Sequence, residues 1–178
     1  MSRLDTFIAR LQAQKTLLEW AAAKLQSAGD QLPGPVIELG LGNGRTYDHL
    51  RELLPDRRII AFDRTLDANP RSTPPADDLI LGDIRTTGPA FAERFGATAA
   101  LLHADLGNGV PKDEAVLQRW LPGVVVGLVR PGAIVASSTL LEHPELTSIS
   151  LPPAVPAGRY YAYTRHSGRP TVAFVRTR

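Results

Sequence analysis

The chain has 178 residues, with 20 lysine and arginine residues, 18 aspartate and glutamate residues, a formal net charge of +2 and no cysteine. This length suits one α/β domain and is too short for two, and the missing cysteines exclude disulfides, thiolate metal sites and cysteine nucleophiles. Because the sequence has neither a run of about twenty apolar residues nor an apolar signal region, we expect a cytoplasmic protein with no membrane partner.

The first 30 residues predict an amphipathic helix over 2–28, which packs on or covers a single domain formed by residues 31–178. Apolar residues recur at helical spacing, with Arg10 and Gln14 mostly off the apolar stripe. Ser2 and Asp5 have the spacing of a capping box, and Gly29 follows as a C-terminal stop. We expect this helix to pack on an edge of the sheet; a lid or a contact in a homo-oligomer is the alternative.

A short buried strand over 36–39 is followed by three alternate glycines and then by a helix over 45–54. Glycines let the backbone pass close to a ligand, and the start of a helix favours a negative group. Glu38, at the end of the strand, favours a positive group on the same ligand. An amino acid head carries both charges, whereas a plain pyrophosphate does not.

The run Glu38-Leu39-Gly40-Leu41-Gly42-Asn43-Gly44 resembles the first motif of class I S-adenosylmethionine-dependent methyltransferases, an acid followed by alternate glycines. The dinucleotide fingerprint G-x-G-x-x-G does not fit, because its third glycine would fall on Arg45. The resemblance implies that S-adenosyl-L-methionine is the cofactor. The residues of this motif that it assigns to cofactor binding are Glu38, Gly40, Leu41, Gly42, Asn43 and Gly44. A tight turn without a ligand is the alternative.

Acids stand at the ends of the next two strands. The strand over 57–62 runs into Asp63, close to the interval after the glycine turn at which an acid accepts hydrogen bonds from both ribose hydroxyls. Arg64 follows and is included in the expected cofactor site. After a loop over 64–78, the strand over 79–82 ends at Asp83 and Ile84. The resemblance assigns Asp83 to the adenine amino group and Ile84 to the ring. Either acid could instead only cap a helix, and a helix over 89–95 is predicted next.

A fourth strand over 99–104 is followed by Asp105-Leu106-Gly107-Asn108-Gly109, which resembles the fourth methyltransferase motif. The resemblance implies that Asp105 and its loop line the methionine end of the cofactor and the methyl-transfer site. No catalytic residue is identified from the sequence. His103 and Asp105 are the candidates, and a hydrogen-bonded core or rim histidine is the favoured alternative for His103. A helix over 111–129 follows, with Pro111 at its favoured first position.

The last third of the chain predicts a fifth strand over 133–137 after an Arg130-Pro131-Gly132 turn, a short helix over 139–147, and an antiparallel hairpin of strands 159–165 and 171–176. The expected fold is therefore α/β and Rossmann-like, as in the methyltransferases. It has a mostly parallel seven-stranded sheet, a C-terminal antiparallel hairpin and an added N-terminal helix.

The predicted function is methyl transfer to a small-molecule acceptor located between the loop over 105–109, the N-terminal helix and the region after Ser138. One compact domain leaves no target-recognition domain, and the net charge is too small to collect a polyanion. Two alternatives remain. One is a non-catalytic cofactor-binding module or oligomer partner. The other is a nucleic-acid methyltransferase that uses the C-terminal hairpin, since residues 157–178 contain five arginines.

No metal ion is expected. Metal-dependent catechol-type methyltransferases, which this chain resembles in size, have an Asp-Asn pair after the fifth strand. This sequence has Ser137-Ser138-Thr139 there. Asp105 alone offers too few oxygen ligands for a tight magnesium site.

Overall fold

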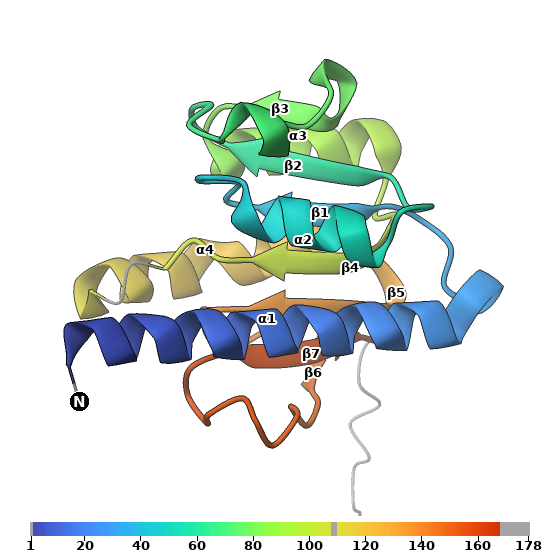
Figure 1. Ribbon diagram of the computed structural model, residues 1–178. Coiled ribbons are helices and arrows are strands. Elements are labelled where there is room, and N and C mark those ends of the chain that lie inside the picture. The colour runs from blue at the N-terminus through green and yellow to red at the C-terminus, as the bar shows by residue number, and fades with distance from the viewer. Residues whose placement is uncertain (1, 108–109, 168–178) are drawn as a thin grey trace, which may run out of the picture.

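The computed structural model describes residues 2–107 and 110–167 of the chain. The helices are α1 Arg3–Ala28, α2 Arg45–Leu53, α3 Ile84–Phe95 and α4 Pro111–Leu128, with short 3-10 turns η1 Gly29–Gln31, η2 Pro70–Ser72 and η3 Ala76–Asp78. The strands are β1 Val36–Leu39, β2 Ile59–Asp63, β3 Leu79–Leu81, β4 Ala99–Ala104, β5 Val129–Ser137, β6 Leu146–Ser148 and β7 Tyr161–Arg165. Figure 1 shows α1 and α2 on one face of the sheet and α3 and α4 on the other.

Within the described residues the sheet has seven strands in the order β3-β2-β1-β4-β5-β7-β6. The first five strands are parallel, β7 is antiparallel to β5, and β6 is antiparallel to β7. This confirms the predicted α/β fold with a mostly parallel sheet. The chain builds outward from β1 to β3 and then places β4 on the other side of β1. The carboxyl ends of β1 and β4 therefore form a topological switch point, where open α/β sheets bind ligands.

The parallel strands are buried on both faces because helices cover both. On one face Leu18 of α1 and Leu50 of α2 pack with Val36 and other residues of the central strands. On the other face Leu121 of α4 packs with Ile37 and its neighbours. The alternation along β1 thus sends successive side chains into two separate apolar layers.

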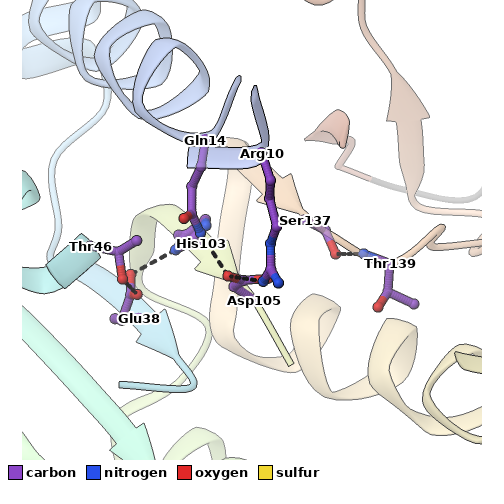
Figure 2. A network of polar contacts seen from close by, with 8 residues as sticks. All are labelled: Arg10, Gln14, Glu38, Thr46, His103, Asp105, Ser137 and Thr139. Carbon is purple, nitrogen blue, oxygen red and sulfur yellow. Dashed lines mark hydrogen bonds and ion pairs between the residues drawn. The ribbon is translucent and has the colours of Figure 1, made fainter. Parts of the chain in front are cut away.

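Helix α1 begins as its sequence predicts. The backbone N–H of Asp5 donates to Ser2 Oγ at 3.1 Å, and the Ser2 N–H donates to Asp5 Oδ2 at 2.8 Å, which completes the capping box. Its contacts with the sheet include β4 and β5, which lie inside the sheet, so the helix lies across a face and not on an edge. The N-terminal part of α1 reaches the end of β4 (Figure 1), where Arg10 contacts Asp105 (Figure 2).

One predicted element is wrong, and another begins earlier than predicted. The segment 139–147 forms no helix, and its last residues belong to β6, which pairs Leu146 with Arg165 of β7. In the described chain β7 therefore pairs antiparallel with β5 on one side and with β6 on the other. The predicted hairpin strand over 171–176 lies outside the described residues. Helix α3 starts at Ile84 and not at Pro89, because Asp83 accepts a hydrogen bond from the Arg85 backbone N–H and caps it there.

Strand β5 starts four residues earlier than predicted. Val129 pairs with Ala99 and Ile134 with Leu101, so the expected turn is an irregularity within the strand, with Gly132 at φ +82°. In the described ranges, none of the helices combines the length and the apolar character needed to cross a membrane.

Candidate functional site

A cavity of about 520 Å³ lies at the carboxyl ends of the central strands and is called the first cavity below. The predicted site residues that line it are Gly40, Gly42, Asp63, Arg64, Asp83, Ile84 and Asp105. Leu106, Val116, Leu117 and Trp120 add an apolar wall. These residues are far apart in the sequence and meet because the carboxyl ends of parallel strands share one edge of the sheet. Leu41, Asn43 and Gly44 belong to the glycine turn but do not line the cavity.

The glycines of the turn have different functions. A Cβ on Gly40, which has φ +90°, would lie 2.8 Å from Leu106 Cδ2 and 3.0 Å from the Asp105 carbonyl oxygen. This glycine therefore lets β1 pass against the loop after β4. Gly42, at φ +49°, faces open space, so the absence of a side chain there leaves room at the cavity. Gly44 begins α2 at φ +82°, and no side chain caps that helix.

Asp63 and Asp83 both present carboxylates to the first cavity. Asp63 accepts hydrogen bonds from the Gly42 N–H at 2.7 Å and the Arg64 N–H at 2.6 Å, which ties the end of β2 to the glycine turn. Asp83 caps α3 and pairs with the Arg85 guanidinium at 2.5 Å, and these hydrogen bonds lower its pKa to about 2. The cap that was the alternative function of Asp83 is present, and its residue lines the cavity as well.

Glu38 is not at the cavity. It is fully buried, and its two oxygens contact the Thr46 hydroxyl and, at 2.9 Å, His103 Nδ1 (Figure 2). The register of the sheet causes this pairing, since β1 and β4 place Glu38 directly beside His103. Both oxygens of Glu38 are thus engaged by protein groups, and its contact with the positive group of a ligand stays a prediction.

His103 is also fully buried and lines neither of the cavities at this edge. Burial alone would lower the pKa of its imidazole, but the Glu38 carboxylate and the negative charge of Asp105 outweigh burial and raise it. Within the described residues its Nε2 atom has no hydrogen-bond partner. The structure places His103 as a buried, hydrogen-bonded histidine, the favoured alternative to a general base.

Helix α1 supplies two residues that sequence analysis did not assign to the site. Gln14 Nε2 donates to Asp105 Oδ2 at 2.7 Å, and Arg10 Nη2 lies 3.3 Å from the same oxygen (Figure 2). Gln14 is only 6% exposed. The sequence analysis placed Gln14 mostly off the apolar stripe, and this is wrong, because Gln14 stands between Leu11 and Leu18 at helical spacing. A polar residue on such a stripe indicates a buried hydrogen-bond partner.

A second cavity of about 530 Å³ adjoins the first, and the two share Asp105. Its lining residues come from α1, the loop after β4, α4 and the segments after β5 and before β7; those with polar side chains are Arg10, Asp105, Glu114, Gln118, Ser138, Arg159, Tyr160 and Tyr161. This is the region in which the sequence analysis expects the acceptor. A third cavity, of about 770 Å³, lies at the amino ends of the strands beside Pro35, Arg58 and Thr98 and contains no predicted site residue.

The segment after β5 forms hydrogen bonds within the protein through Thr139. The Thr139 N–H donates to Ser137 Oγ at 3.0 Å, and the Thr139 hydroxyl donates to Glu114 Oε2 at 3.0 Å (Figure 2 shows the first of these). In the part of the chain that the structure describes, no three His, Asp or Glu side chains are grouped to hold a metal ion. Metal independence stays a prediction.

Comparison with known proteins identifies the family to which the chain belongs. A family model described as S-adenosyl-L-methionine methyltransferase matches residues 1–165. The chain is 44% identical to an S-adenosyl-L-methionine methyl transferase from Silicibacter pomeroyi DSS-3, with a TM-score of 0.85 over 93% of this chain and 99% of that chain.

More distant structures share the fold alone. The antibiotic-resistance methyltransferase Kmr has 16% identity and a TM-score of 0.51 over 84% of this chain and 94% of that chain. A variant of the 16S rRNA (adenine(1408)-N(1))-methyltransferase from Catenulisporales acidiphilia, with cosubstrate SAM, has 11% identity and a TM-score of 0.51 over 85% and 92%. No curated protein matches the chain.

Proposed function

The chain belongs to the S-adenosyl-L-methionine methyltransferase family and is a methyltransferase that uses this cofactor, and we propose that the cofactor binds in the first cavity and a small-molecule acceptor in the second. The observation that carries the proposal is the junction of the two cavities at Asp105. Because the chain belongs to a family of methyltransferases, we do not pursue the alternative of a cofactor-binding module without catalysis.

The first cavity suits the cofactor chemically. S-adenosyl-L-methionine offers ribose hydroxyls, an adenine amino group and an ammonium group as donors, and the cavity presents the carboxylates of Asp63, Asp83 and Asp105 as acceptors. Ile84 and Trp120 supply apolar surface for a planar ring. The volume is within the range of small-ligand pockets, roughly 300–1,000 Å³. When bound, the cofactor supplies a methyl group activated on a sulfonium.

The second cavity supports a small acceptor because three separate parts of the chain line it. Arg10 of α1, Gln118 of α4 and Tyr160 before β7 all line it. A nucleic-acid strand would instead need several free cations along an open surface. Arg165, one of the candidate cations, pairs with Glu145 at 2.9 Å and also donates to the Val129 carbonyl oxygen, with 16% of its side chain exposed. Arg169 and Arg176 lie outside the described residues.

The residues of the chain act mainly by positioning. Asp105 is held in place by Gln14 and Arg10, so its carboxylate is a fixed acceptor for a hydroxyl or amine hydrogen of the methyl acceptor. Holding that nucleophile in line with the methyl group supplies most of the acceleration such a reaction needs. His103 has no direct part in this scheme, because it is buried away from both cavities.

Asp63→Asn tests the first cavity. The asparagine keeps the shape but loses the charge and one acceptor, so calorimetric titration should show S-adenosyl-L-methionine binding weaker by roughly 1–3 kcal/mol. Asp67→Asn is the control, because Asp67 contacts Thr65 and does not line the cavity. Equal affinities for both variants and the wild type would remove Asp63 from the site.

The class of acceptor has a separate test. The enzyme is incubated with tritium-labelled cofactor and an extract of the producing organism that has been separated into low-molecular-weight filtrate, protein, RNA and DNA. We expect labelled product from the filtrate. Label in RNA, together with RNA binding that falls steeply as salt is raised, would replace the small-molecule proposal by the nucleic-acid alternative.

A further inference from the structure

The charged side chains of the second cavity differ in whether another residue of the protein binds them. Arg10 and Asp105 form an ion pair, and Glu114 accepts a hydrogen bond from Thr139. The exposed Arg159 side chain makes no hydrogen bond and no ion pair with any residue of the described ranges. Its backbone N–H alone is bonded, to the Pro156 carbonyl oxygen at 3.2 Å. Arg159 therefore brings a positive charge to this cavity without a counter-charge from the described protein.

Two hydroxyl groups of the cavity walls are also unsatisfied. The Ser138 Oγ and Tyr160 Oη atoms are buried and have no hydrogen-bond partner of ordinary geometry in the described part of the chain, although Arg10 lies close enough to Tyr160 to influence its titration. Burial and the negative charge of Asp105 raise the pKa of Tyr160, so its hydroxyl stays protonated and can donate at neutral pH. Buried polar atoms without a partner are unfavourable unless a ligand or water meets them.

We propose that the acceptor carries an oxyanion, a carboxylate or a phosphate, and that Arg159 binds this group with hydrogen bonds from Ser138 and Tyr160. This inference rests on the proposed function of the second cavity. A guanidinium presents two parallel N–H groups that match either oxyanion. Arg159 is thereby a specificity-determining residue.

The charges of the cavity also orient the acceptor. Asp105 lines both cavities, whereas Arg159 lines the second cavity and not the first. Arg10 and Asp105 already neutralise each other, so the carboxylate or phosphate is attracted to Arg159, unpaired within the described ranges, and lies beside it and not beside Asp105. The opposite end of the molecule, which carries the methyl-accepting atom, is then directed to Asp105 and the first cavity.

The test is binding of small probes measured by calorimetry and by saturation-transfer NMR. The probes are benzoate and phenyl phosphate, with benzamide as the neutral analogue of benzoate. Wild type, Arg159→Gln, Arg159→Lys and Arg119→Gln are compared. Arg119 is exposed on α4 and does not line the cavity, so its replacement removes the same charge elsewhere.

We expect an oxyanion probe to bind about tenfold more weakly to Arg159→Gln than to wild type, since a charge-assisted hydrogen bond is lost. Arg159→Lys should retain part of the affinity, Arg119→Gln should match the wild type, and benzamide should bind no variant as well as benzoate binds the wild type. Tighter binding of benzoate points to a carboxylate, and tighter binding of phenyl phosphate points to a phosphate.

Equal affinity of wild type and Arg159→Gln for both oxyanions, or no binding of either, would overturn the inference. RNA binding that depends on Arg159 while neither small probe binds would also overturn it. Titration with S-adenosyl-L-methionine on the same proteins separates the two proposals. If the cofactor binds and the probes do not, only the oxyanion inference fails; if the cofactor does not bind the wild type, the proposed function fails. Circular dichroism checks that each variant is folded.

Discussion

Replacing Gln14 by leucine tests whether α1 holds the carboxylate at the junction of the two cavities. Gln14 is 6% exposed and donates to Asp105 at 2.7 Å. A hydrogen bond to a charged group contributes roughly 1.5–3 kcal/mol. Leucine is similar in size but cannot donate. In Gln14→Leu, Asp105 still has its ion pair with Arg10, and 15% of the Asp105 side chain is exposed to water. We therefore expect the free energy of unfolding to fall by about 1–2 kcal/mol.

The neighbouring arginine gives an internal comparison. Arg10 Nη2 lies 3.3 Å from Asp105 Oδ2, and 39% of the arginine side chain is exposed. Solvent screens such a pair, so its contribution should be about 0–1 kcal/mol. Gln14→Leu should therefore destabilise the protein more than Arg10→Met does, although only the arginine variant removes a charge. Urea unfolding followed by circular dichroism measures both.

Gln12→Leu is the matched control, since Gln12 is exposed on the same helix. A double-mutant cycle with Asp105→Ala, which removes the acceptor, then isolates the hydrogen bond. The reasoning is refuted if Gln14→Leu unfolds at the same urea concentration as Gln12→Leu. It is also refuted if the cost of Gln14→Leu is unchanged in the Asp105→Ala background, because the hydrogen bond would then not be its cause.

Three further predictions concern pH, metal and the glycine turn. Burial lowers the pKa of His103, but Glu38 and Asp105 outweigh burial and raise it above the ordinary value of 6.5. The charged imidazole therefore contributes its whole stabilisation below pH 6.5, and this contribution is lost as the pH rises through the pKa of His103 in the folded protein. The unfolding free energy of wild type relative to His103→Gln should shrink over that interval; a constant difference would contradict this. Turnover, measured as release of the demethylated cofactor, should survive EDTA, and a loss that magnesium restores would show a metal requirement. Gly40→Ala should lower the melting temperature more than Gly158→Ala, because both glycines have positive φ but only Gly40 has neighbours within 3.0 Å of the added Cβ; equal effects would remove the steric argument.

The sequence by itself determined the order and type of most elements and the edge of the sheet at which the first cavity lies. Hydrophobic periodicity and turn residues are local signals, and they place the strands that end at Asp63, Asp83 and Asp105. Since parallel strands end at one edge, an acid after each strand predicts a shared cavity without any knowledge of the packing. The turn at Gly40, Gly42 and Gly44 could be predicted in the same way, because closely spaced glycines in the sequence indicate a tight turn there.

Only the tertiary structure decided which partner each side chain has. Glu38 binds His103 because strand register places them side by side, and Gln14 meets Asp105 because α1 crosses the sheet at β4. The same holds for the end of the predicted helix over 139–147, where Leu146 and Thr147 belong to β6 because they pair with the edge of β7. A local pattern reports the period of a segment and the face it buries. Which residues then meet depends on register and crossing geometry, and these are fixed by contacts between segments that are distant in the sequence.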